Sequence, residues 1–110
     1  KLLQVMETEK LYLNSNLTID DLSKTTGIPK HHITEVLNEK YSRNFFTFIN
    51  EYRVREVINR IGETQFQHYT LLAIAFDSGF NSKSTFNSFF KAYTGKTPSQ
   101  YRDEFLNTVK

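Results

Sequence analysis

The sequence of 110 residues contains no cysteine and no tryptophan, and it has only two prolines and four glycines. A chain without cysteine forms neither disulfides nor thiolate metal sites, which fits the reducing cytoplasm. No apolar run approaches the roughly 18 residues of a membrane-spanning helix, and no signal peptide is visible. So few glycines also leave none for a phosphate-cradling loop. We therefore expect no membrane contact by this segment and no glycine-loop nucleotide site.

A large excess of charge of one sign is missing as well. Fourteen lysines and arginines stand against twelve aspartates and glutamates, and the net charge is +2. Residues 1–44 hold six basic and six acidic side chains, whereas residues 45–110 hold eight basic and six acidic ones. Because phosphate neutralisation is local, the placement of the basic residues matters more than their sum.

The sequence does contain the apolar and aromatic residues that a core needs. Hydrophobic residues make up 38% of the chain and aromatic residues 15%, with ten phenylalanines and six tyrosines. This composition argues against disorder. The length fits one domain, or two very small subdomains that share a spacer. The chain begins at Lys1 inside a helical pattern, so we expect a C-terminal domain excised from a longer protein.

Residues 71–102 carry the clearest pattern. Thr70 is a good N-cap for a short helix with one apolar face, and Gly79 can end this helix in the left-handed conformation. A second helix is then predicted, whose buried side carries Phe86, Phe89, Phe90 and Tyr93 at i, i+3, i+4 and i+7. Two helices joined by a glycine turn, the second with a compact polar face, predict a helix-turn-helix unit whose second helix reads DNA.

The same arrangement occurs earlier in the chain. A first unit lies 52 residues earlier, where Thr18, Gly27 and Ile28 stand in the places of Thr70, Gly79 and Phe80. At an offset of 53, the apolar residues of the later unit's second helix match Ile33, Val36 and Leu37, so the later turn is one residue longer. Two such units in one chain can do the work of a dimer on an asymmetric DNA site.

The remaining segments complete an all-α prediction of about seven helices. Lys1 to about Leu13 is predicted to be one packing helix, and Asn44 is predicted to cap a spacer helix over residues 45–61. Thr97 should cap the last helix, with Gln100 completing a capping box. The spacer has apolar residues on more than one side and spans roughly 25 Å. The predicted organisation is a helix-turn-helix subdomain at 1–44, the spacer at 45–61 and a second subdomain at 62–110.

One set of residues in the second unit keeps a specific order and spacing over about 30 positions: Ile74-Ala75, Gly79-Phe80, Phe86, Phe90-Lys91, Gly95, Thr97-Pro98 and Tyr101-Arg102. This set resembles the AraC/XylS family of bacterial transcription regulators, in its C-terminal DNA-binding domain. The resemblance continues upstream through residues 45–53 into the first unit and covers nearly the whole chain.

The resemblance implies regulation of transcription through sequence-specific binding of double-stranded DNA, with RNA polymerase recruited or blocked by the bound protein. It implies a cytoplasmic protein, associated with the nucleoid when bound. A missing N-terminal region would sense a signal or dimerise the chain, and the parent of some relatives is membrane-anchored. No cofactor is expected.

A reading helix meets base edges with its exposed N-terminal turns. The predicted base-contacting residues of the second unit are Lys83, Ser84, Asn87 and Ser88, and those of the first unit are Lys30, His31, Thr34 and Glu35. Asparagine can pair with adenine, lysine can donate to guanine, and glutamate can accept from cytosine but also repels phosphate. Many family members carry arginine where this chain has Glu35 and Ser88, and Ser42 stands where glycine is common. Fewer cationic contacts predict weaker intrinsic DNA affinity or dependence on a second subunit.

Phosphate contacts are predicted where positive charge and helix starts coincide. The residues are Lys91, Lys96, Thr97 and Asn44. Arg53 matches an arginine of the family motif, and we expect a structural role for it between the two subdomains, whereas Arg55 is expected to be solvated.

Other functions have less support in the sequence. His31 and His32 are adjacent, so on a helix they point about 100° apart, and no third metal ligand is evident. His68 and Asp77 could form an acid–base pair, but nothing places a nucleophile beside them. We therefore expect neither a metal site nor catalysis. The alternative function is a helical protein-interaction module that has lost DNA readout, an idea to which the near-neutral charge and Glu35 lend support.

Overall fold

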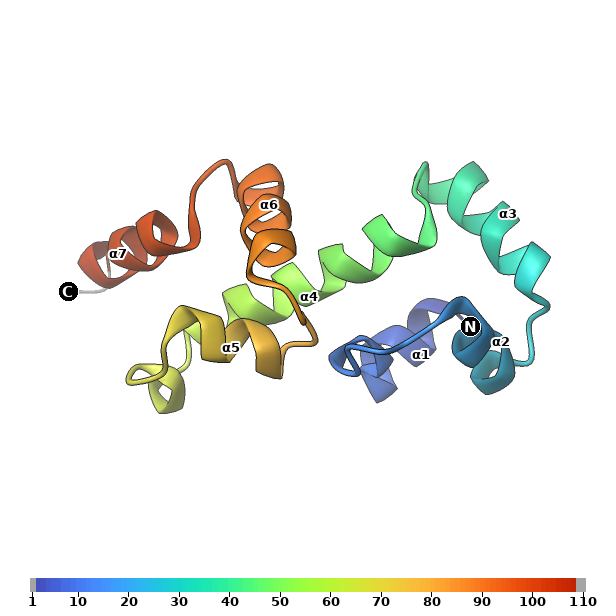
Figure 1. The fold of residues 1–110 in the computed structure, drawn as a ribbon, viewed down its shortest axis with the longest axis horizontal. Coiled ribbons are helices and arrows are strands. Elements are labelled where there is room, and N and C mark those ends of the chain that lie inside the picture. The colour runs from blue at the N-terminus through green and yellow to red at the C-terminus, as the bar shows by residue number, and fades with distance from the viewer. Residues whose placement is uncertain (1, 109–110) are drawn as a thin grey trace.

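The computed structural model describes residues 2–108, in which helices joined by loops are the regular structure and no strand occurs (Figure 1). The helices are α1 (Leu2–Glu9), α2 (Ile19–Thr26), α3 (Lys30–Tyr41), α4 (Phe45–Ile61), α5 (Leu71–Asp77), α6 (Lys83–Thr94) and α7 (Pro98–Thr108), with 3-10 turns η1 (Leu11–Leu13) and η2 (Thr64–Phe66). The all-α prediction with seven helices is therefore confirmed. None of the described helices is long and apolar enough to cross a membrane.

Side-chain caps begin the helices where the sequence predicts them. Thr18 and Asp21 form a reciprocal capping box at α2, with both N–H···O distances at 3.1 Å. Thr97 and Gln100 form the equivalent box at α7, at 3.0 and 3.2 Å. Each box satisfies two of the N–H groups that the first turn of a helix leaves unpaired. Thr70, the repeat counterpart of Thr18, caps α5 by accepting from the Ala73 N–H at 3.0 Å.

The predicted single helix up to Leu13 is wrong. The helix α1 ends at Glu9, because Lys10 adopts a left-handed conformation (φ 50°) and a 3-10 turn follows. Lys1, the predicted start, lies outside the described residues. The break turns Tyr12 inward, where its ring stacks on Tyr52 at 5.5 Å between centroids and its hydroxyl donates to Glu56 at 3.0 Å. Tertiary packing on α4 therefore overrides the local helical preference.

The central helix α4 lies between two hydrophobic cores and belongs to both (Figure 1). Its N-terminal half contributes Phe48, Ile49 and Tyr52 to a core shared with α1, α2 and α3. Its C-terminal half contributes Val54, Val57 and Ile61 to a second core shared with α5, α6 and α7. A helix with apolar residues on more than one side is buried on more than one side, as the sequence predicts here.

Two aromatic residues at the surface differ from the simple helical pattern. Tyr93, predicted to be buried, is 45% exposed. It lies in the last turn of α6 beyond Phe90, the last fully buried ring, and lines an open hollow beside Arg43 and Asn44. Phe46 in the first turn of α4 is also exposed, but its ring contacts Phe89 of α6 at 5.5 Å between centroids. This contact joins the start of α4 to the second helix-turn-helix.

Candidate nucleic-acid interface

The exposed face of α6 carries all four residues predicted to touch bases in the second unit. Phe86 and Phe90 are buried on the opposite face. Ser82 caps the helix by accepting a hydrogen bond from the Thr85 N–H at 3.3 Å. The exposed side chains are those of Lys83, Ser84, Asn87 and Ser88. The aromatic residues thus fix the rotation of α6 about its axis and leave an amide, two hydroxyls and an ammonium facing solvent.

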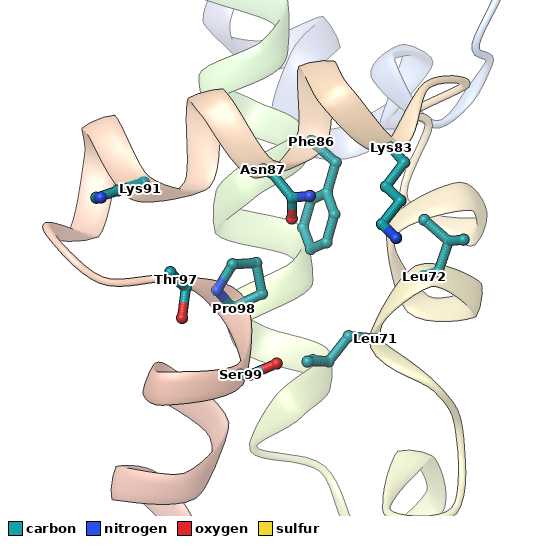
Figure 2. A pocket seen from close by; sticks show the side chains of 9 residues that line it. All are labelled: Leu71, Leu72, Lys83, Phe86, Asn87, Lys91, Thr97, Pro98 and Ser99. Carbon is teal, nitrogen blue, oxygen red and sulfur yellow. The ribbon is translucent and has the colours of Figure 1, made fainter.

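A hollow of about 520 Å³ adjoins this face of α6. Figure 2 shows Asn87 of α6 above Pro98 at the start of α7, and Lys83 at the start of α6 beside Leu72 of α5. The hollow is also lined by Lys91, Thr97, Pro98 and Ser99. Lys83 and Lys91 lie at opposite ends of the hollow, Lys91 on the side of the start of α7 (Figure 2). Ammonium groups and a helix N-terminus favour an anion.

The four predicted phosphate-contacting residues differ in what they contact within the protein. Lys91 lines the hollow. Lys96 Nζ lies 2.8 Å from Glu104 Oε1, so its charge already has a partner in the structure. The side chains of Thr97 and Asn44 accept hydrogen bonds from the N–H groups of Gln100 and Thr47 as N-caps. Any anion contact at these two caps would therefore come from backbone N–H groups rather than from the capping oxygens.

In the first unit, α3 presents the corresponding surface. The four predicted residues, Lys30, His31, Thr34 and Glu35, are all exposed, while Ile33 and Leu37 are buried. Lys30 Nζ lies 3.1 Å from Asp20 Oδ1 of α2. The Thr34 hydroxyl donates to the Lys30 carbonyl at 3.2 Å. The exposed face of α3 therefore matches that of α6 in its place in the repeat but is less positively charged.

Sequence reasoning missed Asp20 and Leu72 as neighbours of the two reading helices. The repeat carries the signal that could have found them, because both residues follow the N-cap threonine of their unit by two positions. In the first unit this position holds a carboxylate beside Lys30, and in the second it holds an apolar side chain beside Lys83.

Arg53 joins the two units from the middle of α4. Its guanidinium donates to the carbonyls of Tyr12 and Asn14 at 2.7 and 2.9 Å and to the Asn50 side chain at 3.0 Å. Burial lowers the pKa of Arg53 to about 10, so it is still a cation at neutral pH. This agrees with the expected structural role. Arg55, expected to be solvated, is exposed but also stacks over the Tyr52 ring at 4.2 Å.

A second buried polar group on α4, Glu56, was not anticipated. It accepts hydrogen bonds from Tyr12 at 3.0 Å and from Arg60 at 2.8 Å, and Lys10 Nζ lies 3.5 Å away. Burial by itself raises the pKa of this carboxyl, but the two hydrogen bonds and the charges of Lys10 and Arg60 outweigh burial and lower it. Glu56 is therefore ionised at neutral pH and ties η1 to α4.

The described residues bring no group of three or more histidine, aspartate or glutamate side chains into metal-binding proximity. His31 and His32 are both exposed, and their rings meet edge-on at 4.7 Å between centroids. His68, which follows η2, and Asp77, which ends α5, are exposed as well.

The sequence profile of a helix-turn-helix domain family matches residues 22–104 of this chain. This span runs from α2 through α4 into α7 and so contains both α3 and α6. The chain belongs to the AraC-type helix-turn-helix family. Members of this family are DNA-binding transcription regulators rather than enzymes.

Named relatives agree with the assignment to the AraC-type family. An uncharacterized HTH-type transcriptional regulator of Staphylococcus aureus (strain COL) is 29% identical over 104 residues, 94% of this chain but only 14% of the relative. The HTH-type transcriptional activator AarP of Providencia stuartii is 30% identical over 90 residues, 82% of this chain and 64% of AarP. This AraC-type chain therefore spans about one seventh of the Staphylococcus relative.

The fold of the AraC-type chain also matches solved structures. The C-terminal domain of AraT, a response regulator from Geobacillus stearothermophilus, superposes with a TM-score of 0.75 at 17% identity, covering 94% of this chain and 84% of that one. A protein of unknown function from Listeria innocua superposes with a TM-score of 0.71 at 22% identity, covering 90% of each chain.

Proposed function

We propose that this AraC-type domain binds a specific sequence of double-stranded DNA by placing α3 and α6 in adjacent major grooves. The observation that carries the proposal is the exposed polar face of α6 beside a hollow with two lysines and the start of α7 at its rim. Polar side chains suited to base edges lie beside positive groups suited to phosphate, and a DNA-reading helix needs both.

Within this proposal, the exposed N-terminal turns of α6 read base edges. Asn87 is suited to adenine, whose N6 and N7 take a bidentate amide, and Lys83 is suited to guanine N7 and O6. Ser84 and Ser88 add hydroxyl contacts. On α3 the matching readers are Lys30, His31, Thr34 and Glu35, with Glu35 accepting from cytosine N4.

Phosphate contacts position the domain on the duplex. Lys91 and the backbone N–H groups behind Thr97 hold one phosphate at the hollow of the second unit. Lys96 contacts another phosphate, but Glu104 lies 2.8 Å from its ammonium group and shares its charge, so we expect a smaller contribution from Lys96 than from Lys91. The first turn of α4, capped by Asn44, is the corresponding anchor of the first unit.

The dimensions of the domain suit two successive grooves. Its longest extent is 47 Å, and one turn of B-DNA repeats about every 34 Å. A site of roughly 20 base pairs would thus accommodate both units. The division into units at 1–44 and 62–110 with α4 as strut stays a prediction, supported by the two cores that meet on α4.

Selection of bound sequences from random duplex DNA, followed by titration of the selected site, tests the proposal. We expect two half-sites to emerge, the half-site under α6 being the better defined. Asn87→Ala should cost about 1–3 kcal/mol and relax preference at one base pair. Asn59→Ala removes an amide that is also exposed, from α4, and serves as the control, with no expected change in affinity.

The salt dependence of binding separates this function from the alternative one. Several neutralised phosphates make log K fall steeply with log salt concentration. If binding is insensitive to salt and Asn87→Ala behaves as the control does, the domain is a protein-interaction module that keeps the fold and has lost DNA readout.

For the parent protein we propose the setting that the family implies. The domain would lie C-terminal to a region that senses a signal or dimerises, in the cytoplasm, with RNA polymerase as the partner of the bound protein. Deletion of the upstream region and measurement of transcription from a promoter that carries the selected site would test whether this region controls the domain.

A further inference from the structure

The two units differ at one position beside their reading helices. Lys30 begins α3 and Lys83 begins α6, so the two lysines are equivalent in the repeat. The neighbouring residue on the preceding helix is Asp20 in the first unit and Leu72 in the second. Lys30 Nζ lies 3.1 Å from Asp20 Oδ1, whereas Lys83 shares the rim of the hollow with Leu72 (Figure 2).

This difference changes what each lysine offers to a phosphate. A carboxylate 3.1 Å from an ammonium cancels a large part of the attraction between that ammonium and a phosphate a few ångströms farther away. A phosphate that binds Lys30 must displace Asp20 and then stay close to it. Lys30 therefore releases little condensed counterion from DNA, while Lys83 can act as a full positive charge.

Two further substitutions in the repeat act in the same direction. The position of Lys91 on α6 is held by Asn38 on α3, and the position of Ser88 is held by Glu35. Other charges near Asp20 do not offset it, since Asp21 is its chain neighbour and takes part in the α2 capping box. Lys24 follows Asp20 by four positions on α2 and is exposed, but among the described residues only Lys30 lies within ion-pair distance of Asp20.

We propose that Asp20 sets the DNA affinity of the first unit by neutralising Lys30, so that α6 anchors the domain and α3 contributes discrimination with little binding energy. The inference rests on the DNA-binding function proposed above. Asp20 acts through Lys30 rather than on DNA itself. The ion pair is exposed, with 57% of the Lys30 side chain and 64% of the Asp20 side chain accessible, so its loss should leave the fold intact.

The test compares salt dependence in three variants and a control, on the duplex selected with the wild-type domain. Asp20→Asn removes the charge with little change of shape, and Leu72→Asp introduces a carboxylate at the equivalent place beside Lys83. Glu9→Gln removes the same charge from the exposed end of α1, which carries no predicted DNA contact. Circular dichroism verifies that each variant folds.

Each freed lysine should add about 0.9 to the slope of log K against log salt concentration. For Asp20→Asn, the ratio of affinities at 50 and 200 mM salt should therefore grow by a further factor of about 3.5. Leu72→Asp should reduce this ratio by a similar factor, and Glu9→Gln should leave it unchanged. Lys30→Ala combined with Asp20→Asn should abolish the gain.

Several outcomes would overturn the inference while leaving DNA binding intact. They are an unchanged slope in Asp20→Asn, weaker binding by that variant, an equal effect of Glu9→Gln, or a gain that persists without Lys30. If the wild-type domain fails to bind any duplex, the proposed function itself is wrong, and this inference is wrong with it.

Discussion

Gly27 and Gly79 occupy the same place in the two helix-turn-helix units, yet replacing each with alanine should have very different effects. Both have positive φ angles, 75° at Gly27 and 108° at Gly79. A side chain is disfavoured at either angle because its Cβ approaches neighbouring backbone atoms. Local conformation alone would therefore predict a similar penalty at the two positions.

The surroundings separate the two glycines. A Cβ added at Gly27 would meet no atom within 4 Å. A Cβ added at Gly79 would lie 2.1 Å from the Tyr12 carbonyl oxygen and 2.6 Å from Arg53 Nε. These two atoms form a hydrogen bond of 2.7 Å in the junction between the units. Alanine at Gly79 cannot be accommodated unless this junction opens.

The expected costs follow from these contacts. Gly27→Ala should lower the free energy of unfolding by about 1–2 kcal/mol, the cost of a left-handed alanine. Gly79→Ala adds the loss of a buried hydrogen bond to a charged group, about 1.5–3 kcal/mol, so its total should reach about 2.5–5 kcal/mol. That is a large part of the roughly 5–15 kcal/mol that stabilises a domain.

Urea titration followed by the helical circular dichroism signal measures both values, because the chain has no tryptophan to report by fluorescence. The difference between the two variants isolates the contribution of the junction. Equal losses of unfolding free energy would show that Gly79 matters only for its own backbone, and that the packing of Tyr12 and Arg53 against it contributes nothing.

Three further predictions concern the same junction and the helix starts. Arg53→Met should lower the free energy of unfolding by about 3 kcal/mol in urea titration, because the buried Tyr12 carbonyl and the partly buried Asn14 carbonyl lose a charged donor. Arg55→Met, which loses an exposed stacking contact, should cost under about 1 kcal/mol. The folded pKa of Glu56 lies below its ordinary value of 4.5, so the stability it provides is present above pH 4.5 and is lost as pH falls through the folded value. Glu56→Gln should therefore flatten the wild-type loss of unfolding free energy below pH 4.5, and an unchanged profile would contradict the assigned pKa direction. Thr18→Ala should lower the free energy of unfolding by about 1 kcal/mol. Thr97→Ala should lower it by a similar amount, because it removes the same kind of capping box.

Much of this fold is predictable because its signals are local. A threonine whose hydroxyl accepts from the third residue of a helix needs only a few neighbouring residues, and the boxes at Thr18 and Thr97 form as predicted. The spacing of Phe86 and Phe90 likewise fixes which side of α6 is buried. The exposure of the predicted base-contacting residues follows from the same periodicity.

Prediction failed where distant segments meet. A helix through residue 10 is locally reasonable, but Lys10 turns left-handed so that Tyr12 can reach Tyr52 and Glu56 on α4. The burial of Tyr93 was wrong because helical spacing does not tell where along α6 the core ends. The first error concerns packing against a helix about 40 residues away in the sequence. The second concerns the size of the hydrophobic core.

The amino-acid sequence by itself determined the repeated unit, its caps and turns, the polar faces of α3 and α6 and the family, because each depends on residues close together in the chain. Only the tertiary structure decided that Gly79 is packed where Gly27 is open, and that Lys30 has a carboxylate partner where Lys83 has Leu72 as neighbour. Equivalent positions of a repeat share their local conformation, but their neighbours come from whichever elements the fold brings against them.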